Sequence, residues 1–210
     1  MLETTLVDEA AQDAAIGRLV AVGVRLAIDD LGSAYSSLQR LSALPFHEIK
    51  IDQGLLRHLR DEPLLTFVVL DALIEIGRRL GRDVVVEGLE DRGAIEVAGL
   101  LGATLGQGYG LARPMPAEDL ASWMAGFTLP IDPGKAHTYL GAMAHHWKYG
   151  HAMPRARCPM TGLLAEKGLQ ESEAAHWHEQ AHTRRAPARA IKRLTSWLLD
   201  QVRDEGMATR

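Results

Sequence analysis

Short apolar segments alternate with helical segments over the first 110 residues of this chain, and this alternation constrains the fold more than any other feature. Four segments have the length of a strand and are mostly rich in β-branched residues: residues 24–28, 48–51, 83–86 and 103–106. Apolar residues recur at helical spacing before and between them, in residues 11–22, 63–80 and 91–101, and a glycine follows each of these helices. The alternation predicts a parallel sheet covered by helices, which is the α/β class.

Polar side chains lie at or just after the end of each predicted strand. They are Asp29, Asp30, Lys50, Asp52, Glu87, Glu90 and Gln107. The carboxyl ends of parallel strands share one edge of the sheet, where α/β folds place their chemistry. A single acid at a strand end commonly caps the next helix or faces water, but the same feature at four strands favours a site.

Clustered carboxylates at this edge need a cation to stay ionised together, and oxygen ligands suit Mg²⁺ or Mn²⁺. Two such ions can clamp a phosphodiester and activate a water molecule. In that chemistry, we expect Lys50 to hold the phosphate or the attacking water. The sequence therefore indicates a metal-dependent site for a phosphorylated substrate.

Four motifs of the first half resemble, in order, those of EAL domains, the bacterial cyclic di-GMP phosphodiesterases. Residues 29–38 read DDLGSAYSSL, residues 49–52 IKID, residues 86–90 VEGLE and residues 107–116 QGYGLARPMP. The resemblance covers roughly residues 1–128. It implies the second half of an EAL (β/α)8-type barrel, a signal-transduction hydrolase fold that uses Mg²⁺ or Mn²⁺ on cyclic di-GMP.

The resemblance also assigns roles to the strand-end residues. It makes Asp29 and Asp30 metal ligands, and Glu87 a metal ligand or a base. Lys50 corresponds to the residue that positions water. The remaining expectations are a catalytic role for Asp52 and substrate contacts for Gln107 and Glu90.

Three ligands of an EAL site have no counterpart in this sequence. They are the Glu of the Glu-Ala-Leu signature, an Asn from the third strand and the first Glu of the fourth-strand motif, while Glu3 matches that motif's second Glu, which braces the Asp-Asp loop. We therefore expect the chain as given to be inactive alone, and leave open whether it is an enzyme. It is the C-terminal piece of a longer gene, a degenerate stand-alone protein, or one of two half-barrels that associate.

An open half-barrel leaves a strand edge and an apolar inner face uncovered, because a closed barrel needs eight strands. This predicts a homodimer, or association with an upstream barrel half. Further partners that the resemblance implies are cyclic di-GMP itself and diguanylate-cyclase or sensor domains.

Composition changes near residues 129–134 (LPIDPG), and seven of the nine histidines lie between His137 and His182. Proline and glycine mark a boundary there, so we expect a partial EAL domain over residues 1–129 and a second domain over 130–210. This tail shows helical patterns over 132–150, 159–167, 170–183 and from 187 onward. Three or four short helices predict a small all-α bundle.

The tail carries a candidate zinc site. His178 and His182 share one helical face, and with the thiol of Cys158 they form a donor set that suits Zn²⁺. These elements resemble the CZB family of chemoreceptor zinc-binding domains, which implies a further ligand, either His145 or His137. The alternative is a set of unrelated histidines and a buried cysteine.

Two functions remain open. The first is part of a cyclic di-GMP phosphodiesterase that produces linear diguanylate, with a tail that senses zinc or redox state. The second is a catalytically degenerate EAL-derived module that acts by protein docking or by zinc sensing.

Composition limits the cellular location that is expected for either function. One cysteine excludes an internal disulfide, no apolar run approaches the roughly 20 residues of a membrane span, and no signal-peptide pattern opens the chain. A cytoplasmic protein follows by elimination. The basic residues from 184 to 193 read as a solvated helix face, so we expect no nucleic-acid or membrane partner.

Overall fold

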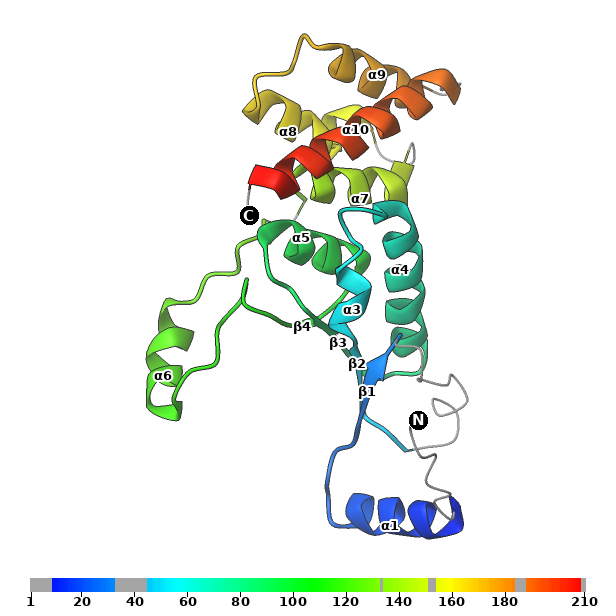
Figure 1. Ribbon diagram of the computed structural model, residues 1–210, viewed down its shortest axis with the longest axis vertical. Helices are drawn as coiled ribbons and strands as arrows, with labels where there is room; N and C mark the ends of the chain where they lie inside the picture. Colours follow the sequence, from blue (N-terminus) through cyan, green and yellow to red (C-terminus); the bar gives the residue numbers. More distant parts are fainter. Residues whose placement is uncertain (1–8, 33–44, 133, 151–153, 184–187, 209–210) are drawn as a thin grey trace.

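A four-stranded sheet forms the centre of the first half of the molecule (Figure 1). The computed structural model describes residues 9–32, 45–132, 134–150, 154–183 and 188–208. The strands are β1 (Ala27–Leu31), β2 (Glu48–Ile51), β3 (Asp83–Glu87) and β4 (Leu105–Gln107), and they are parallel and ordered as in the sequence. The predicted α/β fold with a parallel sheet is confirmed.

Helices α4 (Pro63–Arg79) and α5 (Arg92–Leu101) connect the later strands. Successive side chains of a strand point to opposite faces, and Ile49 and Ile51 of β2 are fully buried. A Cβ on Gly77 of α4 would collide with Val84 and lie 3.4 Å from Ile49, so α4 packs tightly on this face. Lys50 therefore points to the opposite face.

Strand β1 lies further along the chain than predicted. The expected strand over residues 24–28 ends before Asp29, whereas β1 includes Asp29 and Asp30. The pairing with β2 shifts register between Ile28 and Leu31, and Asp30 has a φ of 57°. Aspartate tolerates this left-handed conformation better than most residues, so Asp30 accommodates the local irregularity.

Among the described residues of the first half, the further helices are α1 (Glu9–Ala21), α3 (Gln53–Leu56) and α6 (Ala117–Gly126). Figure 1 shows α1 and α6 standing away from the sheet, and no residue of α6 is buried. Large apolar side chains of and just after α6 are exposed: Leu120, Met124, Phe127 and Leu129. In the described part of the chain, β1 and β4 each have one neighbouring strand.

The second half contains helices α7 (Tyr139–Tyr149), α8 (Pro159–Glu166), α9 (Glu173–Ala181) and α10 (Ala188–Ala208), with a 3₁₀ turn η2 (Arg155–Arg157) before α8. Helix α7 packs against α8 and α10, and α9 packs against α10. The expected start of the first tail helix at Asp132 is wrong. Thr138 caps α7, because its side chain accepts a hydrogen bond from the Gly141 N–H at 2.9 Å.

The tail and the first half share one hydrophobic core, since α7 also packs against α5. Glu96 of α5 is buried, and its carboxylate accepts hydrogen bonds from His137 N, Thr138 N and Thr138 Oγ1 at 3.0, 3.2 and 2.7 Å. The expected division at residue 129, and an independently folded bundle after it, stay predictions. Among the described helices, none has the length and apolar character that a membrane span requires.

Candidate metal centres

Three carboxylates meet at the carboxyl edge of the sheet. Asp29 and Asp30 come from β1 and Glu87 from the end of β3, and one oxygen of each lies within 4.8 Å of the others. The parallel arrangement explains this convergence, because it brings the ends of separate strands to the same edge. We call these three residues, with Lys50, the strand-edge site.

Lys50 supplies the positive charge of the strand-edge site. Its Nζ donates to Asp29 Oδ1 at 2.9 Å and forms an ion pair with Glu87. The bonds to Glu87 and then Asp29 raise the pKa of the Lys50 ammonium above its ordinary value. The site is open to solvent, since the side chain of Asp29 is 64% exposed and that of Lys50 25%. An ion could therefore enter it without a change in the core.

The other predicted residues of this edge have separate positions. Gln107 ends β4 and pairs in register with Glu87, and Glu90 is exposed in the loop after β3. Asp52 caps α3, with Oδ1 accepting from the Gly54 N–H at 2.8 Å. Their expected roles stay predictions, and Glu3 lies outside the described residues.

The QGYG segment holds the loop after β3 in place. Leu89 N donates to Gln107 O at 3.1 Å, and Gly110 N donates to Leu89 O at 2.8 Å. A side chain on Gly108 would collide with the Leu89 backbone, so the close approach of the two loops requires glycine there. The sequence predicted that Gln107 of this segment contacts the substrate, and the packing role of the segment was missed. The two glycines in QGYG could have indicated it.

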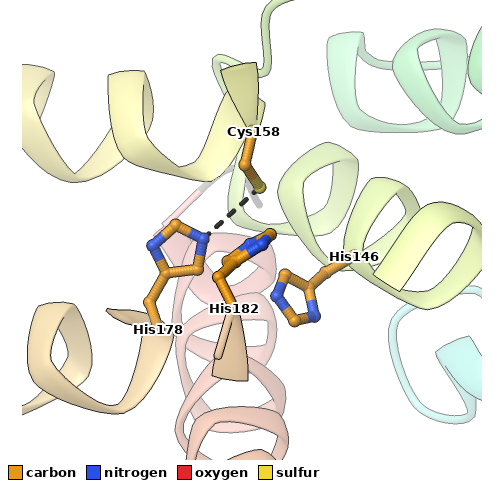
Figure 2. Close-up of side chains that lie close together, drawn as sticks. All are labelled: His146, Cys158, His178 and His182. Atoms are coloured by element: carbon orange, nitrogen blue, oxygen red, sulfur yellow. Dashed lines mark hydrogen bonds between the residues drawn. The ribbon is translucent and has the colours of Figure 1, made fainter. Parts of the chain in front are cut away.

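A second group of donors lies inside the tail. His146 of α7, Cys158 before α8, His178 of α9 and His182 just after α9 each offer one ligand atom, and these atoms lie within 4.8 Å of one another (Figure 2). His178 Nε2 is 3.3 Å from Cys158 Sγ. Cys158 and His178 are 3% and 1% exposed. We call these four residues the tail cluster.

Burial sets the protonation of the tail cluster in the absence of a metal. It raises the pKa of the Cys158 thiol and lowers the pKa of His178 to about 3, with His182 and His146 adding to the second shift. At neutral pH, the cluster therefore holds a thiol and a neutral imidazole on His178. A thiol and neutral imidazoles are borderline-soft donors.

The tail cluster contains His146, and neither His145 nor His137 belongs to it. Successive residues of a helix are about 100° apart, so His145 points elsewhere and lines a cavity of about 420 Å³ between α5 and α7. The ring of His145 lies 4.9 Å from that of Tyr149. His137 precedes α7 and lies 2.9 Å from Asp132 and 3.4 Å from Glu166. The structure thus brings His146, and not the expected His145 or His137, beside the other three donors, and a zinc site there stays a prediction.

Neighbouring histidines on α7 could not be distinguished from the sequence. Residues 139–145 are all buried, because α7 is covered by α5 on one side and by other tail helices elsewhere. A helix buried all round shows no apolar stripe that would reveal its orientation. Only the packing of α7 shows which imidazole faces Cys158.

Fold and site together define a parallel α/β protein with a carboxylate-rich site at the strand ends. Residues 1–114 match the family described as the EAL domain. The match covers more than half of the chain, and this protein belongs to the EAL domain family. The matched region ends before the tail, so the likeness of the tail to CZB domains stays a prediction.

Relatives of known name share this region. The chain is 39% identical over 111 residues to the oxygen sensor protein DosP of Escherichia coli, covering 52% of this chain and 14% of that protein. It is 36% identical over 110 residues to the cyclic di-GMP phosphodiesterase RocR of Pseudomonas aeruginosa, covering 52% and 28%. The chain thus spans less than a third of these two proteins.

The solved EAL domain of Mycobacterium smegmatis DcpA has a similar fold. The TM-score is 0.54 at 29% identity, over 61% of this chain and 57% of that domain. The structural likeness therefore covers little more than half of an EAL domain.

Proposed function

We propose that this chain supplies the second half of a cyclic di-GMP phosphodiesterase site, which hydrolyses cyclic di-GMP to linear diguanylate with divalent metal ions. One observation carries the proposal: ligand oxygens of Asp29, Asp30 and Glu87 lie within 4.8 Å of one another, and Lys50 pairs with Asp29 and Glu87. Membership of the EAL family and relatives named as cyclic di-GMP phosphodiesterases support the substrate class.

The strand-edge residues fit Mg²⁺ or Mn²⁺, because all three donors are carboxylate oxygens and the site is open. Such an ion, when bound, supplies Lewis acidity and a water molecule of lowered pKa. Asp29, Asp30 and Glu87 would hold it. Lys50 would orient the attacking water or a phosphate oxygen, since Asp29 and Glu87 already hold its ammonium at the edge.

Other residues of the same edge complete the proposal. Glu90 and Gln107 would contact the substrate, because both lie exposed at the ends of β3 and β4. Asp52 would act from the start of α3, where its carboxylate is held by the Gly54 N–H.

Metal binding and turnover test this proposal separately. The purified chain should bind Mn²⁺, and Glu87→Gln should weaken that binding at least about tenfold, because a carboxylate ligand is lost. Cyclic di-GMP turnover, followed as linear product, should be negligible, since the family's other ligands have no counterpart in this sequence. Mn²⁺ binding that is equal in wild type and Glu87→Gln would contradict the metal site. Turnover typical of the family would contradict inactivity alone.

For the tail cluster we propose a zinc site. Thiolate sulfur and imidazole nitrogen are both zinc ligands, and four donors allow tetrahedral coordination. The ligands come from α7, the start of α8 and the end of α9, so a bound ion would join these segments. Cysteine bound to zinc is a thiolate, and a thiolate at Cys158 would give the tail a redox-sensing role.

A docking function is the second candidate, and the exposed elements favour it. Strands β1 and β4 have open edges in the described part of the chain, and α6 exposes Leu120, Met124 and Phe127. Such surfaces favour association, here with a second copy or with an upstream barrel half. Sedimentation should show a dimer or larger species for the chain alone. A stable monomer at micromolar concentration would contradict the homodimer.

A further inference from the structure

Helix α10 runs from the tail helix that carries His178 to the first half of the molecule. It has 21 residues, which at 1.5 Å per residue is about 30 Å. Its first half packs against α9, which carries His178, and Arg193 lies 5.7 Å from the ring centre of Trp177. Figure 1 shows α10 crossing the tail toward the end of α5. Its last turn reaches Arg60 of the first half.

Arg60 connects to the loop that follows Glu87 of the strand-edge site. It lies in the turn between α3 and α4, and its Nη2 donates to Asp91 Oδ2 at 2.6 Å. The other oxygen of Asp91 accepts from the Ala94 N–H at 2.9 Å and caps α5. Asp91 follows Glu87 by four residues. Arg60 therefore holds one side of the 87–91 loop, while the QGYG segment holds the other through Leu89.

The tail determines where Arg60 can lie. A Cβ on Gly206 of α10 would be 2.8 Å from Arg60 Cδ, so the missing side chain of Gly206 leaves room for the arginine. The carboxylate of Glu205 adds an attractive charge for Arg60 and accepts from Tyr139 N at 3.2 Å. Within the described residues, Arg60 Nη1 is buried without a hydrogen-bond partner. A buried donor without a partner costs free energy, so contacts from Asp91 and α10 must keep the guanidinium in place.

We propose that Arg60 is a positioning residue of the strand-edge site, and that the last turn of α10 sets its position. The inference rests on the proposed metal site at Asp29, Asp30 and Glu87. Arg60 acts through Asp91, which anchors the loop behind Glu87. The tail is then a structural part of the candidate active site, and disturbance of α10 reaches the metal ligand Glu87 through one side chain.

Two variants disturb the contact between Arg60 and α10, one in the first half and one in the tail. Arg60→Met removes the charge and keeps the aliphatic part, and Gly206→Val fills the space beside Arg60 from the tail. Lys148→Met is the matched control for the first, because Lys148 pairs with Asp71 at 2.9 Å and joins the tail to α4 away from the loop. Gly162→Val is the control for the second, since a Cβ on this helical glycine meets nothing within 4 Å.

Two measurements on the full chain test the effect of these variants. Amide hydrogen exchange of residues 88–95 reports how firmly the loop is held, and Mn²⁺ titration gives the metal affinity of the strand-edge site. Both variants should speed exchange there and weaken Mn²⁺ binding by about three- to tenfold, the range of couplings through packed networks. Arg60→Lys should restore much of both, because a cation returns near Asp91. The two controls should leave both readouts unchanged.

The outcomes distinguish this inference from the proposed function. Unchanged exchange of residues 88–95 in Arg60→Met overturns it, and so does an equal effect of Lys148→Met, which would mean general loosening of the tail. Wild-type protein without Glu87-dependent Mn²⁺ binding would refute the proposed metal site. The exchange comparison would still decide whether Arg60 and α10 position the loop.

Discussion

The strand-edge site gathers three carboxylates at the open end of a sheet, whereas the tail cluster gathers one thiol and three imidazoles between helices. The first has its own cation, because Lys50 contacts Asp29 and Glu87. The second is neutral at His178 and Cys158, whose burial disfavours charge. The two sites therefore differ in what happens without a metal. At the strand-edge site Lys50 offsets one of the three carboxylate charges, while the tail cluster leaves polar groups packed in a core.

This difference predicts where a metal contributes to stability. An ion held weakly at the exposed strand-edge site adds little to the free energy of unfolding, because stabilisation by mass action grows with affinity. At the tail cluster, a bound ion would form coordination bonds with the buried polar groups. These bonds would join three segments of the tail. We expect chelation to destabilise the tail and to leave the sheet nearly unchanged.

Loss of zinc should give the largest effect. At free zinc about a thousandfold above Kd, binding adds about 4 kcal/mol to the free energy of unfolding, and Cys158→Ser or His146→Ala should remove most of it. Metal analysis and urea unfolding with and without chelator measure both quantities. His145→Ala is the matched control, and it should keep one zinc per chain. Zinc retained in His146→Ala but lost in His145→Ala would reverse the ligand assignment.

The contact between the two regions should give the next largest effect. Glu96→Ala removes the acceptor of three donors at the start of α7, and we expect a loss of about 3 kcal/mol in the free energy of unfolding. Glu96→Gln should lose less, because its amide oxygen still accepts. Urea unfolding of Glu75→Ala is the comparison. Glu75 also bonds two arginines, but it is partly exposed and its loss should matter little. Equal losses in Glu96→Ala and Glu75→Ala would show that the junction is not special.

Removal of the cation from the strand-edge site should give the smallest effect. Lys50→Met should tighten Mn²⁺ binding about fivefold, because a unit charge about 4 Å away is worth about 1 kcal/mol in solvent-like surroundings. Lys50→Arg should bind Mn²⁺ as the wild type does. Calorimetric titration at constant ionic strength gives the affinities. Weaker binding in Lys50→Met would mean that Lys50 organises the carboxylates rather than competing with the metal.

Local signals in the sequence predicted most of the elements of the first half. Strand segments and helix stops depend on neighbours along the chain, so β2, α4 and α5 lie within one residue of their expected ranges. The end of β1 was misplaced, because Asp29 and Asp30 read as loop residues although pairing with β2 continues beside them. The start of α7 was also misplaced, since the acceptor that favours it is Glu96, 42 residues before Thr138.

The sequence by itself determined which chemical groups this protein has and where they fall relative to strand ends. That sufficed for the carboxylate edge, because parallel strands bring their ends together whatever the details of packing. Only the tertiary structure decided that His146 faces Cys158 and that Arg60 meets both Asp91 and Gly206. These choices depend on how helices rotate and cross when they pack, and a helix that is buried all round carries no local sign of its rotation.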